Sequence, residues 1–95
     1  MNIPDTFKLA GQTITVVRDP NLFHDRKIVG EALYATQQIL LDTGTCPQEQ
    51  LEQNFLHELM HWIFYIMGED ELRCNERVVD LMAQFLYQYE QTKEH

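Results

Sequence analysis

The segment that decides the fold of this chain is FLHELMHWIFYIMG, residues 55–68. Apolar residues recur along it at helical spacing, and further apolar residues make it hydrophobic nearly all round, which is typical of a helix in a protein core. Two histidines, His57 and His61, interrupt this pattern four residues apart. Residues four apart lie on the same face of a helix, so the segment predicts a buried helix that presents two imidazoles side by side.

Together with Glu58, the two histidines form the motif H-E-x-x-H. This spacing on a helix is suited to hold one Zn²⁺ ion. Glu58 lies about 100° around the helix from His57, so it is not expected among the same ligands, but it can take a proton from a metal-bound water. The alternative is two surface histidines and a solvated glutamate. The apolar flanks disfavour it, because polar groups in a core need partners.

A catalytic zinc site needs a third protein ligand, for which Glu76 is the preferred residue. A longer motif, H-E-x-x-H-x-x-G-x-x-H, is excluded because Phe64 and Met67 occupy its glycine and third histidine positions. Gly68 is suited to end the first helix, and a second helix that returns antiparallel brings Glu76 level with His61. The sequence therefore predicts a His57, His61 and Glu76 site.

Other residues near the second helix compete with Glu76 or support the site. The rival ligands are the acidic residues of the turn and one thiol, namely Glu69, Asp70, Glu71 and Cys74. Asp80 lies one helical turn after Glu76, on the same face. A metal-bound histidine usually donates its other N–H to a carboxylate or carbonyl, so Asp80 is expected to accept such a hydrogen bond from His57 or His61.

The motif H-E-x-x-H followed by N-E-x-x-x-D at residues 75–80 resembles the gluzincins, the zinc peptidases that add a glutamate ligand to two histidines. The run FLHELMH, the small size and the apolar second helix are most similar to the ImmA/IrrE-like metallopeptidases, with the single-domain minigluzincins as a close alternative. The resemblance covers roughly residues 54–86.

The resemblance implies that His57, His61 and Glu76 bind one zinc ion per chain and that Glu58 is the general base. It also implies an intracellular protein or peptide substrate, such as a repressor or other regulator of a phage or mobile element. Two alternatives stay open. One is a latent enzyme whose own termini occupy the cleft, and the other is a zinc-stabilised module that binds a protein without cleaving it.

Peptide hydrolysis of this kind needs a further donor to the developing oxyanion. The candidates are His24, Tyr34, Tyr65 and Tyr87. His24 and Tyr87 are slightly preferred. Tyr87 shares the helix face of Glu76, but it lies about 16 Å further along the axis at about 1.5 Å per residue.

Length and charge limit the other classes of function. The 95 residues are expected to form one domain, residues 1–95. A net charge of −8 argues against a nucleic-acid surface, which would be basic. No apolar run is long enough to cross a membrane and no export signal is present, so Cys46 and Cys74 are expected to be free thiols in the cytoplasm.

The residues before the motif predict short strands, and hence an α+β fold. Residues 8–18 are expected to form a strand or a hairpin that turns at Ala10-Gly11, and Leu22–Arg26 to form one helical turn. Glu31–Thr36 and Gln38–Asp42 are expected as two further strands. The predicted fold is a small, mostly antiparallel sheet followed by an active-site helix and an antiparallel glutamate helix. One of the last two strands is expected to be a free edge that binds an extended peptide.

Overall fold

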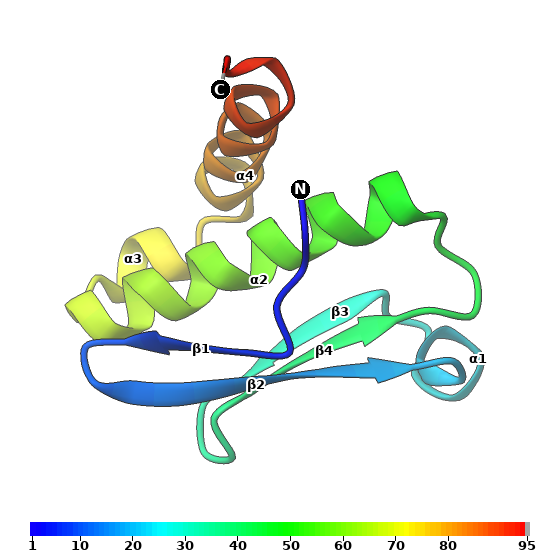
Figure 1. Ribbon diagram of the computed structural model, residues 1–95. Helices are drawn as coiled ribbons and strands as arrows, with labels where there is room; N and C mark the ends of the chain where they lie inside the picture. Colours follow the sequence, from blue (N-terminus) through cyan, green and yellow to red (C-terminus); the bar gives the residue numbers. More distant parts are fainter. Residues whose placement is uncertain (95) are drawn as a thin grey trace.

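The computed structural model, which describes residues 1–94, confirms the α+β architecture (Figure 1). A four-stranded sheet comes first, and two longer helices that pack together follow it. The strands are β1 (Thr6–Leu9), β2 (Gln12–Asp19), β3 (Gly30–Leu33) and β4 (Gln38–Asp42). The helices are α1 (Leu22–Arg26), α2 (Gln48–Met67), α3 (Asp70–Arg73) and α4 (Glu76–Thr92).

The strands lie in the order β1-β2-β4-β3, and the sheet is mixed. β1 and β2 form the antiparallel hairpin expected at Ala10-Gly11, where both turn residues have positive φ. β3 is antiparallel to β4, whereas β2 and β4 are parallel because the chain passes through α1 and β3 between them. Of the two strands considered for the free edge, β3 lies at an edge and β4 lies inside the sheet.

Helix α2 covers one face of the sheet (Figure 1). On β2, Ile14 and Val16 are buried while Thr13 and Thr15 are exposed, which is the alternation of a strand with one face in the core. Trp62 on α2 is fully buried, and its indole N–H donates to the Gln38 carbonyl oxygen at 3.1 Å. This hydrogen bond fixes α2 against the start of β4.

Replacing the indole tests how firmly α2 is held. Trp62→Phe keeps an aromatic ring but leaves the Gln38 carbonyl oxygen without its donor, so the free energy of unfolding is expected to fall by about 1–3 kcal/mol. Urea unfolding followed by circular dichroism measures the change. The exposed control Met67→Leu, in the last turn of the same helix, should stay within about 0.5 kcal/mol of the wild type. Equal stability of the two variants would contradict this anchoring role.

The connection between the long helices differs from the single returning helix that was expected. Gly68 ends α2 in the left-handed conformation, with φ of 74°, as predicted. The one-turn helix α3 follows, and α4 begins only at Glu76. Asn75 sets this start, because its side-chain oxygen accepts a hydrogen bond from the Val78 N–H at 3.2 Å. Glu76 is therefore the first residue of α4, beside α2, rather than a residue inside a longer helix.

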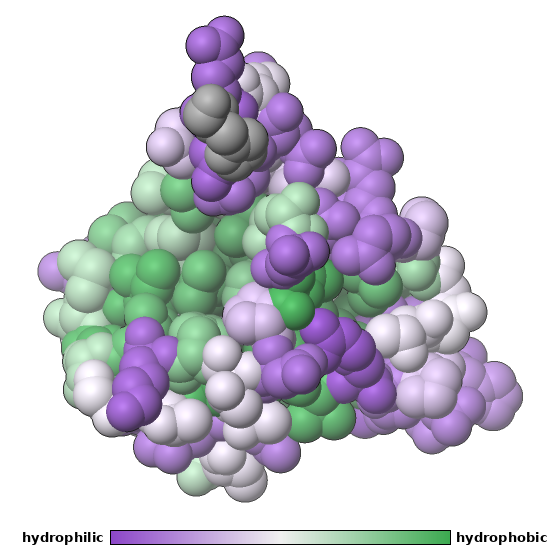
Figure 2. Space-filling model, viewed as in Figure 1, coloured by the Kyte–Doolittle hydropathy of each residue, from purple (hydrophilic) through white to green (hydrophobic). Residues whose placement is uncertain are grey.

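One side of α4 is not covered by α2. Figure 2 shows apolar side chains gathered over the end of α2 and the neighbouring part of α4. The large apolar side chains of α4 that are exposed are Met82, Phe85 and Tyr89. Within residues 1–94, no helix has both the length and the apolar character needed to span a membrane.

Candidate metal centre

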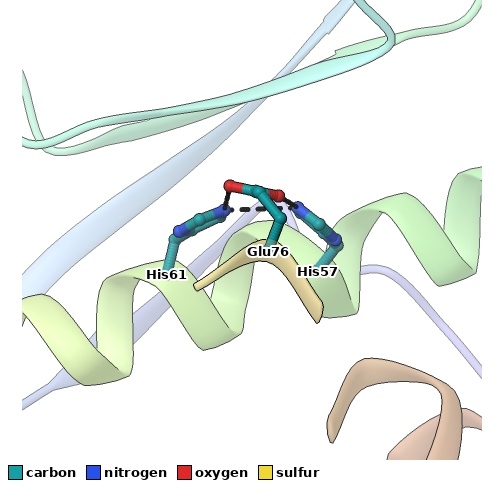
Figure 3. A group of neighbouring side chains, drawn as sticks. All are labelled: His57, His61 and Glu76. Atoms are coloured by element: carbon teal, nitrogen blue, oxygen red, sulfur yellow. Dashed lines mark hydrogen bonds and ion pairs between the residues drawn. The ribbon is translucent and has the colours of Figure 1, made fainter. Parts of the chain in front are cut away.

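Three side chains from α2 and α4 meet at one point (Figure 3). The Nε2 atoms of His57 and His61 lie 3.2 Å apart. The Glu76 carboxylate bridges them, with Oε2 at 3.2 Å from the Nε2 atom of His57 and Oε1 at 3.2 Å from that of His61. Among the described residues, this is the group of three histidine, cysteine or acidic side chains that could hold a metal ion.

The spacing of the donor atoms fits a metal ion. Zinc binds histidine nitrogen and carboxylate oxygen at about 2.0–2.2 Å in tetrahedral geometry, which puts neighbouring donor atoms about 3.3–3.6 Å apart. The three separations of 3.2 Å at this centre come close to that triangle. Two neutral imidazoles and one carboxylate are also the donor set of a catalytic zinc site with an open fourth position. His57, His61 and Glu76 therefore form a candidate metal centre.

The nitrogen of His57 that faces away from the centre has a carboxylate partner. Its Nδ1 atom lies 2.6 Å from Asp80 Oδ1. An ionised carboxylate only accepts hydrogen bonds, so a proton on Nδ1 would satisfy Asp80 and leave the lone pair of Nε2 for a metal ion. Asp80 therefore contacts His57, one of the two histidines that the sequence suggests as its hydrogen-bond partner.

Removing this partner is expected to weaken metal binding without abolishing it. Asp80→Ala frees the orientation and tautomer of His57, and the loss of such a partner typically lowers metal affinity by about 10–100-fold. Competition with a fluorescent zinc chelator measures the change. Glu71→Ala, which also removes an exposed acidic residue, is the matched control and should bind zinc like the wild type. Unchanged affinity in Asp80→Ala would count against this role.

The protonation of His61 depends on its burial and its neighbours. Burial and the neighbouring His57 lower its pKa, while the Glu76 carboxylate acts in the opposite direction. The lowered pKa favours neutral imidazole, the form that binds metal. Each histidine thus has a partner in the segment that follows α2.

Glu58 lies beside the centre but outside the group of donors, as its position on the helix predicted. Its side chain is buried, and burial raises the pKa of its carboxyl group to about 7, an effect that His57 partly opposes. Gly30 on β3 packs against it: a Cβ atom at that position would come within 3.3 Å of Glu58 Cγ. The edge strand and the carboxyl group of Glu58 are therefore in direct proximity.

Two cavities flank the centre along β3. The first has a volume of about 350 Å³, and its walls include Val29, Asn54 and Asp80. The second, of about 390 Å³, is bounded among others by Tyr34 and Arg73. The two cavities share Gly30, Glu58, His61 and Glu76. The candidate centre therefore lies in the middle of a cleft that follows the edge strand.

The structure does not bring the preferred oxyanion donors to this cleft. His24 is exposed on α1 and interacts with its neighbour Asp25 at 3.0 Å. Tyr87 packs against the core, near Glu52. Neither residue lines the two cavities, whereas Tyr34 lines the second one and Tyr65 stacks on Tyr34. Tyr87 shares a helix face with Glu76, but it could approach the centre only if α4 bent back toward Glu76.

The rival ligands stay outside the donor group. Cys74 is exposed and lines the second cavity, while Glu69, Asp70 and Glu71 belong to the turn and the short helix α3. Arg73 also lines this cavity, and the sequence contains no motif that marks it. Arg73 lies beside the cleft because the short helix α3 precedes α4, and a single returning helix would not predict this position.

In the comparisons with known proteins, no family model, no curated protein and no solved structure matches the chain. The site is therefore identified by its geometry alone. It is an arrangement of His-x₃-His plus Glu on two helices that could bind a metal ion.

Proposed function

We propose that this protein is a zinc-dependent metallopeptidase that hydrolyses peptide bonds in a protein substrate. The observation that carries the proposal is the joint placement of the three donors and the buried Glu58 in one cleft. A purely structural metal site has closed coordination and no need of a base beside it. Here the donors number three, and the carboxyl group of Glu58 reaches the same cavities.

His57, His61 and Glu76 would hold the ion, and Asp80 would keep His57 oriented. A zinc ion bound there would polarise the scissile carbonyl group and lower the pKa of water. Glu58 accepts a proton from the attacking water, holds it on a carboxylate oxygen, and returns it to the leaving amine nitrogen. The water oxygen ends on the carbonyl carbon, the C–N bond breaks, and the products are one carboxylate and one amine.

The free edge of β3 supports a peptide substrate. Its main-chain groups on the outer side are not paired within the sheet, so an extended peptide can add as a further strand. Such a peptide would run past Gly30 and Ala32, directly over Glu58 and the donor group. Because the motifs resemble those of the ImmA/IrrE-like metallopeptidases, we further propose that the intracellular substrate is a regulatory protein of a phage or mobile element.

Metal dependence tests the proposal. The protein is freed of metal with a chelator, dialysed, and incubated with an unfolded protein such as reduced casein, with and without one equivalent of zinc. We expect new peptides in the mass spectrum only in the zinc-loaded sample. Tight casein binding without any new peptide would favour the binding module instead.

Within residues 1–94, no residue before Val29 or after Asp80 lines the two cavities, which favours an active form over a self-inhibited one.

A further inference from the structure

Arg73, the last residue of α3, lines the second cavity together with Glu58 and His61. Its guanidinium carbon lies 5.5 Å from the ring centroid of Tyr34. The Tyr34 ring is itself held in place, because it stacks on Tyr65 at 4.1 Å and meets the Trp62 ring edge-on at 5.1 Å. A cation and a phenol therefore face the same cavity from fixed positions.

The hydrogen-bonding capacity of this pair is only partly used. The Nε atom of Arg73 makes no hydrogen bond, and its Nη2 atom reaches Asp70 Oδ1 only at 3.5 Å. A guanidinium group only donates hydrogen bonds, and a tyrosine hydroxyl group can donate one of its own. Arg73 and Tyr34 both line this cavity, and both can donate a hydrogen bond to an anion there.

The carboxylate paired with Arg73 is that of Asp70, which does not line the cavity. Glu31 is paired with Arg26 at 2.6 Å. Glu76, which also lines this cavity, is paired with His57 and His61 at 3.2 Å. Asp70 is largely exposed, and an exposed pair at 3.5 Å is well screened by solvent. Among the residues that line this cavity, Arg73 is the one lysine or arginine.

We propose that Arg73 and Tyr34 form a subsite for a carboxylate group of the peptide substrate, an inference that rests on the proposed peptidase function. Tyr34 follows the carboxyl end of β3, whereas the other cavity begins at Val29, before β3. A peptide that pairs antiparallel with β3 brings the residues on the amino side of the cleaved bond to Tyr34 and Arg73. The carboxylate is then an acidic side chain; a peptide bound parallel to β3 would supply its C-terminal carboxylate instead.

Binding without turnover tests this subsite. The protein used is the zinc-loaded Glu58→Gln variant, and the probes are three short fluorescent alanine-based peptides. The first contains a central glutamate and an amidated C-terminus, the second has glutamine in its place, and the third is the glutamine peptide with a free C-terminal carboxylate. We expect the glutamate peptide to bind about tenfold or more tightly than its glutamine counterpart, because a charged hydrogen bond is formed. Higher affinity of the third peptide alone would assign the C-terminal carboxylate.

Further substitutions in the Glu58→Gln variant show which residue recognises the carboxylate. Arg73→Gln is expected to remove the preference for the carboxylate, and Tyr34→Phe, which keeps the stacked ring, to reduce it. Arg77→Gln changes the net charge equally at an exposed position of α4 and should keep the full preference. A thermal unfolding midpoint and zinc content like those of the parent show that each variant is folded. If Arg73→Gln perturbs folding, Arg73→Lys is used in its place. It is expected to weaken the preference, because lysine lacks the planar guanidinium group that donates two parallel hydrogen bonds to a carboxylate.

Three results would overturn the subsite: no preference for either carboxylate peptide, a preference that survives Arg73→Gln, or no binding of any of the peptides. The test does not depend on hydrolysis. A wild-type protein that cleaves nothing, but whose Glu58→Gln form prefers the carboxylate through Arg73, would refute the peptidase proposal and leave the carboxylate subsite standing.

Discussion

Glu58→Gln is expected to reduce zinc-dependent peptide hydrolysis by about 10²–10⁴-fold or more, while zinc content and stability stay near those of the wild type. Glutamine has almost the same shape as glutamate, so it can fill the buried position beside Gly30. Its amide can neither accept the proton of the attacking water nor return it to the leaving amine. The measurement is the initial rate of peptide release at saturating zinc.

The matched control is Glu49→Gln, an exposed position on the first turn of the same helix. It removes the same charge from α2 far from the cleft and should hydrolyse the substrate at the wild-type rate. Activity that persists in Glu58→Gln, with zinc bound, would mean that another group moves the proton. Loss of zinc in Glu58→Gln would show instead that Glu58 belongs to the ligands.

Glu76→Gln is expected to weaken zinc binding by more than the roughly 10–100-fold expected for Asp80→Ala, because Asp80 only orients a ligand while Glu76 is one. The substitution keeps a side chain of similar size at the start of α4 and leaves the Asn75 cap in place. It exchanges the carboxylate that bridges His57 and His61 for a neutral amide. Titration against a zinc chelator of known affinity gives the ratio, and peptide hydrolysis at limiting zinc should fall in parallel.

Glu71→Gln serves as the control for this second prediction, because Glu71 is a rival carboxylate in the same turn region. It should bind zinc like the wild type. If Glu71→Gln lost zinc and Glu76→Gln kept it, the connection between the helices would adopt a different arrangement when metal is bound. The third ligand would then have to be sought in α3.

The features that follow from local patterns were predictable. The apolar period of residues 55–68 specifies α2, and Gly68 ends it where a residue with positive φ is needed. The spacing of His57 and His61 then follows from helical geometry alone. Counting residues along a returning helix also predicts Glu76 as the third ligand, although the chain reaches that position by a different path. Helix α3 and the Asn75 cap bring Glu76 to the same place as the single returning helix would have done.

The features that depend on distant pairing were not predictable from local pattern. The parallel pairing of β2 with β4 decides that β3 is the edge strand beside Glu58, and no local period distinguishes these two strands. Tyr34 is one of four candidate oxyanion donors in the sequence, and no motif marks Arg73. These two residues come from separate elements and meet only because β3 and α3 lie on either side of the cleft.

The most direct test of the metal centre is anomalous diffraction from crystals of the zinc-loaded protein, with data collected on both sides of the zinc absorption edge. We expect one anomalous peak per chain, enclosed by the Nε2 atoms of His57 and His61 and the carboxylate of Glu76. A zinc peak elsewhere in the chain, or a zinc-saturated crystal without a peak at this point, would contradict it.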